Sequence, residues 1–347
     1  MTCDFTLLVG TVGHGLFRSE DGGQSFDWIN KGVSCNEVTV RGLAVDPLDA
    51  RHVLMATAIF DTGMPSLGTP YGLHESFDGG ATWKPIESFK GIECWRIAFD
   101  MQRPSCYYVG TRPAAIYRTD DGKTFEKLPT NWPSTCRGIG LPRVTSINIH
   151  PADSDFLFVS VEIGGFYRSL DGGNSWERVL HDVDTPPPNG AVFGKGGRED
   201  GHYSVISRGD PDLVIASTPD GSYASADRGK TWALLPVLQV FPQQYHHDLA
   251  VKLDHPNTLF YGVGDDTVGG QGALLRTKNR GVSWEAAKFP EPCNSPIWSI
   301  CQHRSNLARI VTCTHYGMVF CSEDAGDTWR KIPREFTETR AICWVPN

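Results

Sequence analysis

The chain has 347 residues, and its 32 Lys and Arg against 40 Asp and Glu give a formal net charge of −8. It contains no basic run and no basic stripe with interleaved aromatic residues, so we expect neither nucleic acid nor an anionic membrane as a partner. No apolar run approaches the roughly 18 residues of a membrane span.

A short pattern recurs seven times along the chain: Ser, any residue, Asp, any residue, Gly, any residue, Ser or Thr, and an aromatic residue. Five full copies start at Ser19, Ser76, Ser169, Ser225 and Ser322. A sixth starts at Thr277 and has Asn279 in the Asp position. The seventh, Asp120 to Phe125, has Arg118 in the Ser position. The copies recur at a period near fifty residues, which indicates a repeat architecture.

Each copy stands between two short apolar and aromatic runs, such as Gly165–Ser169 and Trp176–Leu180. This arrangement predicts a β-hairpin whose turn is the motif. The Asp carboxylate can accept N–H groups of residues that follow it, and the Gly supplies a positive φ angle. The aromatic residue can pack beneath the turn. We therefore interpret the motif residues as structural.

The units follow one order along the chain. An inner strand ends in a polar residue and Pro, as at Gly42–Pro47 and Ile147–Pro151, and a second strand such as Val53–Thr57 follows. A third strand enters the motif and a fourth leaves it. Residues 5–11 match a second strand, and residues 340–346 match the missing inner strand. The sequence therefore predicts one domain over 1–347, an all-β, seven-bladed β-propeller closed by its C-terminal strand.

The N-terminus has no basic n-region and no cleavage site, and it enters a predicted strand almost at once. Ten cysteines are scattered without the two-residue spacing of a zinc knuckle. We expect reduced, buried thiols and a cytoplasmic location.

The repeated motif, quoted above at Ser19, Ser76, Ser169, Ser225 and Ser322, resembles the Asp box, or bacterial neuraminidase repeat (BNR), of sialidase-type and related β-propellers. The resemblance covers almost the whole chain. It implies boxes on the outer rim of the ring, away from a central pocket. It also implies a glycosyl-hydrolase-like activity, although relatives of this fold include non-enzymatic assembly factors. The Phe/Tyr-Arg-Ile-Pro motif of sialidases is absent, so their arginine triad cannot be carried over.

In a propeller blade the inner strand begins, and the second strand ends, on one face close to the axis. Ionisable and aromatic residues occupy these positions in every unit. Before the inner strands stand Arg41, Arg96, Arg143, His202, His247 with Asp248, Trp298, and Arg340 with Glu338. After the second strands stand His14, Asp61, Arg112, Glu162, Asp220, Asp265 with Asp266, and His315. The sequence therefore predicts a site at the axis.

Two chemistries fit this set. In the first, His202, His246, His247 and His315 bind a divalent transition metal, with Zn, Fe, Cu or Co as candidates. In the second, a glycosidase-like site draws its acid and its base or nucleophile from Asp61, Glu162, Asp265 and Asp266. Arg41, Arg96, Arg112, Arg340 and Trp298 then hold a small polar or anionic substrate.

A non-catalytic propeller that binds or assembles a protein partner is the alternative to a hydrolase-like enzyme. It predicts that the axial groups pair with one another and that the long segments dock the partner. Those segments are 59–71, 181–202 and 264–272.

Overall fold

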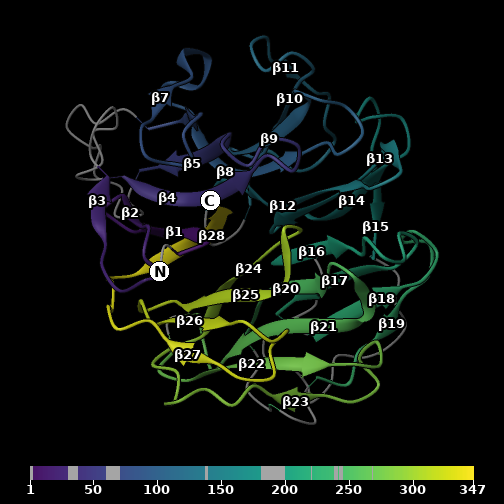
Figure 1. Ribbon diagram of the computed structural model, residues 1–347. Coiled ribbons are helices and arrows are strands. Elements are labelled where there is room, and N and C mark those ends of the chain that lie inside the picture. The colour runs from purple at the N-terminus through teal and green to yellow at the C-terminus, as the bar shows by residue number, and fades with distance from the viewer. Residues whose placement is uncertain are drawn as a thin grey trace.

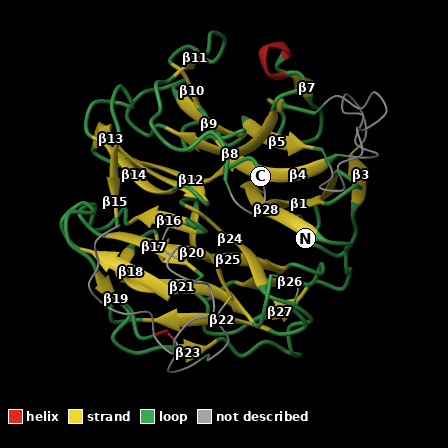
Figure 2. Cartoon of the chain, turned by 180° about the vertical axis from the view of Figure 1, so that it is seen from behind, coloured by secondary structure: helices red, strands yellow, loops and turns green. Residues whose placement is uncertain are grey.

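The computed structural model describes residues 3–29, 38–59, 71–136, 140–180, 200–219, 221–237, 241, 245–267 and 269–347. Seven four-stranded antiparallel sheets surround a central axis as blades, which confirms the predicted propeller (Figure 1). Figure 2 shows the same ring from behind, built almost wholly of strands. No described segment forms a helix that is long and apolar enough to cross a bilayer.

The seven sheets follow in chain order. The first contains β28 (Thr339–Pro346), β1 (Phe5–Thr11), β2 (Leu16–Ser19) and β3 (Asp27–Ile29). The second contains β4 (Thr39–Val45), β5 (Val53–Ala58), β6 (Leu73–Ser76) and β7 (Lys84–Pro85), which a 3-10 helix, η2 (Glu87–Phe89), follows. The third contains β8 (Glu93–Phe99), β9 (Tyr107–Arg112), β10 (Ile116–Thr119) and β11 (Glu126–Lys127). The fourth contains β12 (Arg143–His150), β13 (Asp153–Glu162), β14 (Gly165–Ser169) and β15 (Glu177–Val179).

The last three sheets repeat this order. The fifth contains β16 (Tyr203–Ile206), β17 (Val214–Thr218), β18 (Gly221–Ser225) and β19 (Ala233–Leu234). The sixth contains β20 (Tyr245–Lys252), β21 (His255–Gly264), β22 (Gly272–Thr277) and β23 (Glu285–Ala286). The seventh contains β24 (Ile297–His303), β25 (Asn306–Thr314), β26 (Val319–Ser322) and β27 (Arg330–Lys331).

The ring closes through its two ends. β28 pairs antiparallel with β1, from Phe5 opposite Pro346 to Thr11 opposite Thr339. The C-terminal strand therefore supplies the inner strand of the first blade, as predicted. Because every inner and second strand now has its neighbours, the first blade presents no open edge at the closure.

The repeated motif forms the turn between the third and fourth strands. In the copy at Ser169, the Asp171 carboxylate accepts the Ser175 backbone N–H at 2.8 Å and its hydroxyl at 2.6 Å. The Ser169 hydroxyl donates to Asp171 at 2.7 Å and accepts the Gly173 N–H at 2.8 Å. Hydrogen bonds from Ser175 hold the pKa of Asp171 below its usual value. Trp176 packs beneath the turn, so the structural interpretation of these residues is supported by their contacts.

One copy differs from the prediction. Thr119, rather than Arg118, takes the Ser position, because its hydroxyl donates to Asp121 at 3.1 Å. Asp121 in turn accepts the Thr124 N–H at 2.7 Å. This turn is one residue shorter than the others. Aligning the seven copies by the rest of the motif therefore placed Arg118, one residue too early, in the Ser position. Arg118 instead donates to the Gly172 carbonyl of the next blade's turn at 3.4 Å.

The core lies between adjacent blades. One cluster joins Leu8 of β1 with Val53 and Met55 of β5, and another joins Tyr108 of β9 with Leu157 of β13. Full burial of such a side chain contributes roughly 1.5–3 kcal/mol. The nine described cysteines are free, and Cys35 lies outside the described residues. Blade-to-blade packing therefore fixes the inner strands around the axis.

Candidate functional site

A cavity of about 380 Å³ runs along the axis and is lined by the inner strands of all seven blades. Its middle is apolar, with side chains such as Leu43, Ile97 and Val205. The cationic and carboxylate side chains among its described lining are five arginines and one acid: Arg41, Arg96, Arg208, Arg304, Arg340 and Asp248. The cavity therefore carries a strong positive charge, although the chain as a whole is acidic.

Bulges place the side chains at one mouth of this cavity. The pairing of inner and second strands skips Arg41 in β4, Trp95 in β8 and Trp298 in β24. Both His247 and Asp248 are skipped in β20. A bulge bends the strand and re-aims the side chain that it carries. The repetition of the bulge at one level of the ring gathers these residues around the axis.

Planar side chains stack around this mouth. Trp95 lies between two guanidinium groups, with the Arg41 carbon 4.2 Å and the Arg143 carbon 4.4 Å from its ring. On the other side of the ring, His247 stacks on Trp298 at 3.7 Å between centroids. Arg340 lies over Trp298 at 4.3 Å. These stacks orient the guanidinium groups without neutralising their charge.

Three glutamates at the same mouth are engaged in ion pairs. Glu162 at the end of β13 makes a bidentate pair with Arg143 at the start of β12, with one N–O distance of 2.6 Å. In the preceding blade Glu93 and Arg112 approach to 3.6 Å. Glu338 pairs with Arg340 and lies 3.1 Å from His315. These ion pairs connect neighbouring strands and engage the carboxylates in contacts within the fold.

Asp248 differs from these glutamates. Its carboxylate accepts the backbone N–H of Ile300 at 2.7 Å and that of Leu249 at 2.9 Å. The Tyr203 hydroxyl also donates to it. Burial raises the pKa of Asp248 to about 7. A carboxyl that titrates near neutral pH inside a cavity is suited to proton transfer.

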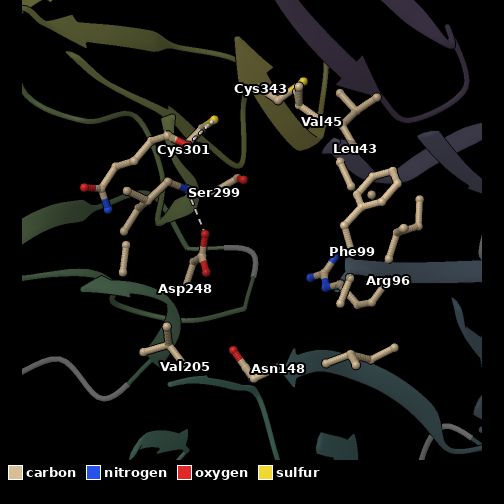
Figure 3. A pocket seen from close by; sticks show the side chains of 18 of the residues that line it. Leu43, Val45, Arg96, Phe99, Asn148, Val205, Asp248, Ser299, Cys301 and Cys343 are labelled. Carbon is tan, nitrogen blue, oxygen red and sulfur yellow. Dashed lines mark hydrogen bonds between the residues drawn. The ribbon is translucent and has the colours of Figure 1, made fainter. Parts of the chain in front are cut away.

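Arg96 faces Asp248 across the cavity (Figure 3). Its guanidinium donates to the carbonyls of Arg41 at 2.5 Å and Thr145 at 2.6 Å, which belong to the two neighbouring blades. It also lies 5.8 Å from the ring of Tyr203. A fixed cation and a carboxyl of raised pKa thus face one another across the cavity.

The predicted catalytic carboxylates do not converge in the cavity. Glu162 is held by Arg143. Asp265 accepts the N–H groups of Gly270 at 3.2 Å and Gln271 at 3.0 Å, and it closes its own loop. Asp266 is exposed and accepts the Thr267 N–H at 2.6 Å. Asp61 lies outside the described residues. None of the three described acids belongs to the cavity lining.

The four histidines predicted as metal ligands are engaged separately. His202 approaches Asp200 at 3.4 Å and the His246 carbonyl at 2.6 Å. The His246 ring packs against Tyr261, and burial lowers its pKa to about 3. His247 stacks on Trp298, and His315 contacts Glu338 and Arg340. The described residues contain no cluster of three or more His, Cys, Asp or Glu that could hold a metal ion.

The predicted substrate-binding residues divide in two. Arg41, Arg96, Arg340 and Trp298 line the cavity, whereas Arg112 does not and pairs with Glu93. Tyr203 and Trp95 were not among the predicted site residues, and Asp248 was expected only beside His247. Their common signal was position, because all three lie within the first four residues of an inner strand. The bulges that turn Trp95 and Asp248 inward leave no mark in a single sequence.

No protein-family model matches the chain. A probable oligoxyloglucan-reducing end-specific xyloglucanase of Neosartorya fischeri is 25% identical over 200 residues, which are 50% of this chain and 23% of that protein. This chain therefore matches less than a quarter of that relative's length. The structure of a GH74 xyloglucanase from Xanthomonas campestris aligns with a TM-score of 0.54 and 17% identity, over 94% of this chain and 58% of that one. YCF48 from Cyanidioschyzon merolae aligns with a TM-score of 0.57 and 14% identity, over 87% and 88%. At these identities the structural likeness concerns the fold alone.

Proposed function

We propose that the protein is a hydrolase-like enzyme that takes a small anionic substrate into its axial cavity. The observation that carries this proposal is the charge of the lining, to which the inner strands contribute three arginines, Arg41, Arg96 and Arg340, and one carboxyl, Asp248. Guanidinium groups bind carboxylates and phosphates through paired hydrogen bonds. Glu338 balances part of this charge through its pair with Arg340, and an anionic ligand would balance more of it.

In this proposal Arg41 and Arg340 bind the anionic group at the mouth, and Trp298 packs against the rest of the ligand. Asp248 exchanges the proton. Its carboxyl donates to the leaving group when protonated and accepts a proton from water when ionised. Tyr203 fixes the carboxyl through its hydroxyl, and Arg96 favours the ionised form from the opposite wall. The role of acid and base thus moves from the acids first predicted to Asp248.

A glycoside with an acidic group is the substrate class that we propose. The partial match to a xyloglucanase supports a sugar substrate. We also propose that the chain belongs to the Asp-box family, and this assignment supports a sugar substrate too. The hydrogen bonds of the turn at Ser169 agree with that assignment. The four histidines form no donor cluster in the described chain, so we propose acid–base chemistry rather than metal-assisted hydrolysis.

Hydrolysis of fluorogenic glycosides tests the proposal. The panel should pair neutral sugars with their acidic counterparts, for example a glucoside with a glucuronide, and should include a sialoside and xyloglucan oligosaccharides. We expect turnover of an acidic member and a loss of about 100-fold or more in kcat for Asp248→Asn. Arg340→Gln should raise KM with a smaller change in kcat.

The exposed Asp27→Asn variant removes one acid at a distance from the axis and should behave as the wild type. Full activity in Asp248→Asn, or faster turnover of the neutral sugar of each pair, would exclude the proposed roles. No turnover of any member would favour the second candidate.

The second candidate is a binding propeller without catalysis. The ion pairs of Glu162 with Arg143 and of Glu338 with Arg340 favour it, because mutual pairing of axial groups is what such a propeller needs. YCF48 shares this fold. Recovery of one stoichiometric protein partner from a native extract, lost in Arg340→Gln, would support this reading.

A further inference from the structure

The cavity has a second mouth, opposite the one at which Trp95 and Trp298 lie, and this far mouth is also basic. Arg208 follows β16 by two residues, Arg304 directly follows β24, and His303 is the last residue of β24. All three line the cavity. The six residue steps from Trp298 to Arg304 span about 20 Å at the rise of an extended strand. The two mouths are therefore separate binding regions.

The charges at this far mouth are not neutralised. The acids of the neighbouring turns are already bound, since Asp210 pairs with Arg280 and Asp254 with Lys252. In the described part of the chain, no hydrogen-bond or ion-pair acceptor contacts either Arg208 or Arg304. The Arg208 and Arg304 side chains are exposed to solvent at this mouth, and the surrounding protein wall together with the charge of Arg304 lowers the pKa of Arg208. The two cations repel one another, and an anion bound between them would relieve this repulsion.

The third donor is His303. The Ser305 backbone N–H donates to its Nδ1 at 3.2 Å, and the Ser305 hydroxyl lies 2.9 Å from the same nitrogen. With Nδ1 as the acceptor of both, the neutral ring carries its proton on Nε2. This Nε2 is buried and has no hydrogen-bond partner among the described residues. The ring is held edge-on to Trp344 at 5.2 Å. A buried N–H without an acceptor destabilises the protein, and an entering oxyanion would supply the missing acceptor.

We propose that Arg208, Arg304 and His303 form a second anion site, which binds a small oxyanion of the phosphate or carboxylate type at the far mouth. The two guanidinium groups supply the paired donors, and His303 supplies the Nε2–H. The site contains none of the groups assigned to the hydrolytic chemistry, so it goes beyond the proposed function. It would give the channel an anion site at each end.

Nitrogen NMR of the protein labelled with ¹⁵N-histidine tests this site directly. The His303 signal is identified by its loss in His303→Gln. Titration with inorganic phosphate, and separately with succinate, should shift the His303 Nε2 signal to saturation. We expect Arg208→Gln and Arg304→Gln each to weaken the response at least tenfold, and the double variant to abolish it.

Two control variants make the result specific. Arg51→Gln removes an exposed arginine from the turn between β4 and β5, outside the cavity lining, and should leave the affinity within twofold of the wild type. Asp248→Asn should also leave it unchanged, which separates this site from the proposed hydrolysis. Far-ultraviolet circular dichroism and the other histidine signals report whether each variant is folded.

Saturation by either probe supports the site, and the tighter probe identifies the chemistry of its natural ligand. A His303 signal that ignores both probes would overturn the proposal. So would an equal response in the folded double variant, or an equal loss in Arg51→Gln, because either result would mean that the anions act through general screening.

Discussion

The Asp248 carboxylate accepts a hydrogen bond from the backbone N–H of Ile300, 2.7 Å away on the neighbouring blade. This bond ties β20 to β24 and fixes a carboxyl in the lining of the axial cavity. Burial nevertheless makes the ionised form unfavourable and raises its pKa to about 7. One residue therefore joins blade packing to the acid–base chemistry of the cavity.

The raised pKa of Asp248 predicts a pH-dependent stability. The folded protein keeps the proton up to about pH 7, whereas the unfolded chain releases it near 3.8. The contribution of Asp248 to the free energy of unfolding is therefore greatest below pH 3.8. It falls as the pH rises to 7 and is constant above that pH. The loss across this window is up to about 4 kcal/mol.

The free energy of unfolding, measured in urea from pH 4 to pH 8, checks this prediction. Asp248→Asn leaves one backbone donor poorly paired and should lower the overall stability by about 1–3 kcal/mol. Its stability should change less between pH 5 and pH 7 than that of the wild type. Parallel curves for the two proteins would contradict the raised pKa.

Metal removal is predicted to leave the fold intact. His202, His247 and His315 are held by an acid, a tryptophan ring and an ion pair, so they do not meet at one ion. A metal present at 100 times its Kd would contribute about 2.7 kcal/mol of stability. We expect the Tm to be unchanged after dialysis against a chelator, and elemental analysis should find less than one transition-metal ion per chain. A reversible fall in Tm that zinc restores would contradict this expectation.

The ring could be predicted because its signals are local. Each turn, such as Ser169 to Trp176, contains its own hydrogen-bonding partners, and seven copies at a regular period define the blades. The pair of Arg143 and Glu162 was within reach too, since both were assigned to the same end of adjacent strands. By contrast, Asp248 and Ile300 are 52 residues apart on different blades. Their contact depends on blade packing and on a bulge, and neither is visible in a single sequence.

The turn at Ser169 predicts a different pH dependence. Hydrogen bonds from Ser175 lower the pKa of Asp171, so its contribution is present above the unfolded value near 3.8 and is lost as the pH falls through the folded value. Asp171→Asn should cost about 1 kcal/mol at pH 7 and should weaken the loss of stability below pH 4.

The chain contains its own control for this turn. Asn279 already accepts the Ser283 N–H at 3.0 Å in the equivalent position. Asn279→Asp should therefore add acid sensitivity where Asp171→Asn removes it. Acid-induced unfolding followed by tryptophan fluorescence measures both variants. Identical acid midpoints in the two variants would show that these carboxylates do not contribute.

Arg309 of β25 is predicted to stabilise the closure of the ring. Its guanidinium lies 3.9 Å from the Phe5 ring and 4.9 Å from the Trp344 ring, so it contacts both strands that meet at the closure. It also bonds Glu323 at 2.9 Å and Asp4 at 2.8 Å, with only 5% of the side chain exposed. Loss of this buried cation should cost about 3 kcal/mol in Arg309→Ala, since two ion-pair partners and two ring contacts are lost together.

Arg280→Ala is the matched control for the closure. Arg280 pairs with Asp210 on the exposed surface, away from the meeting point of the termini, and such pairs contribute at most about 1 kcal/mol. Thermal unfolding compares the two variants, and hydrogen exchange reports where the fold opens. We expect faster exchange in β1 and β28 of Arg309→Ala only, because an opened closure frees the backbone pairs between Phe5 and Pro346. If the two variants lose equal stability, the exposed and buried arginines contribute alike, and the closure does not depend on Arg309.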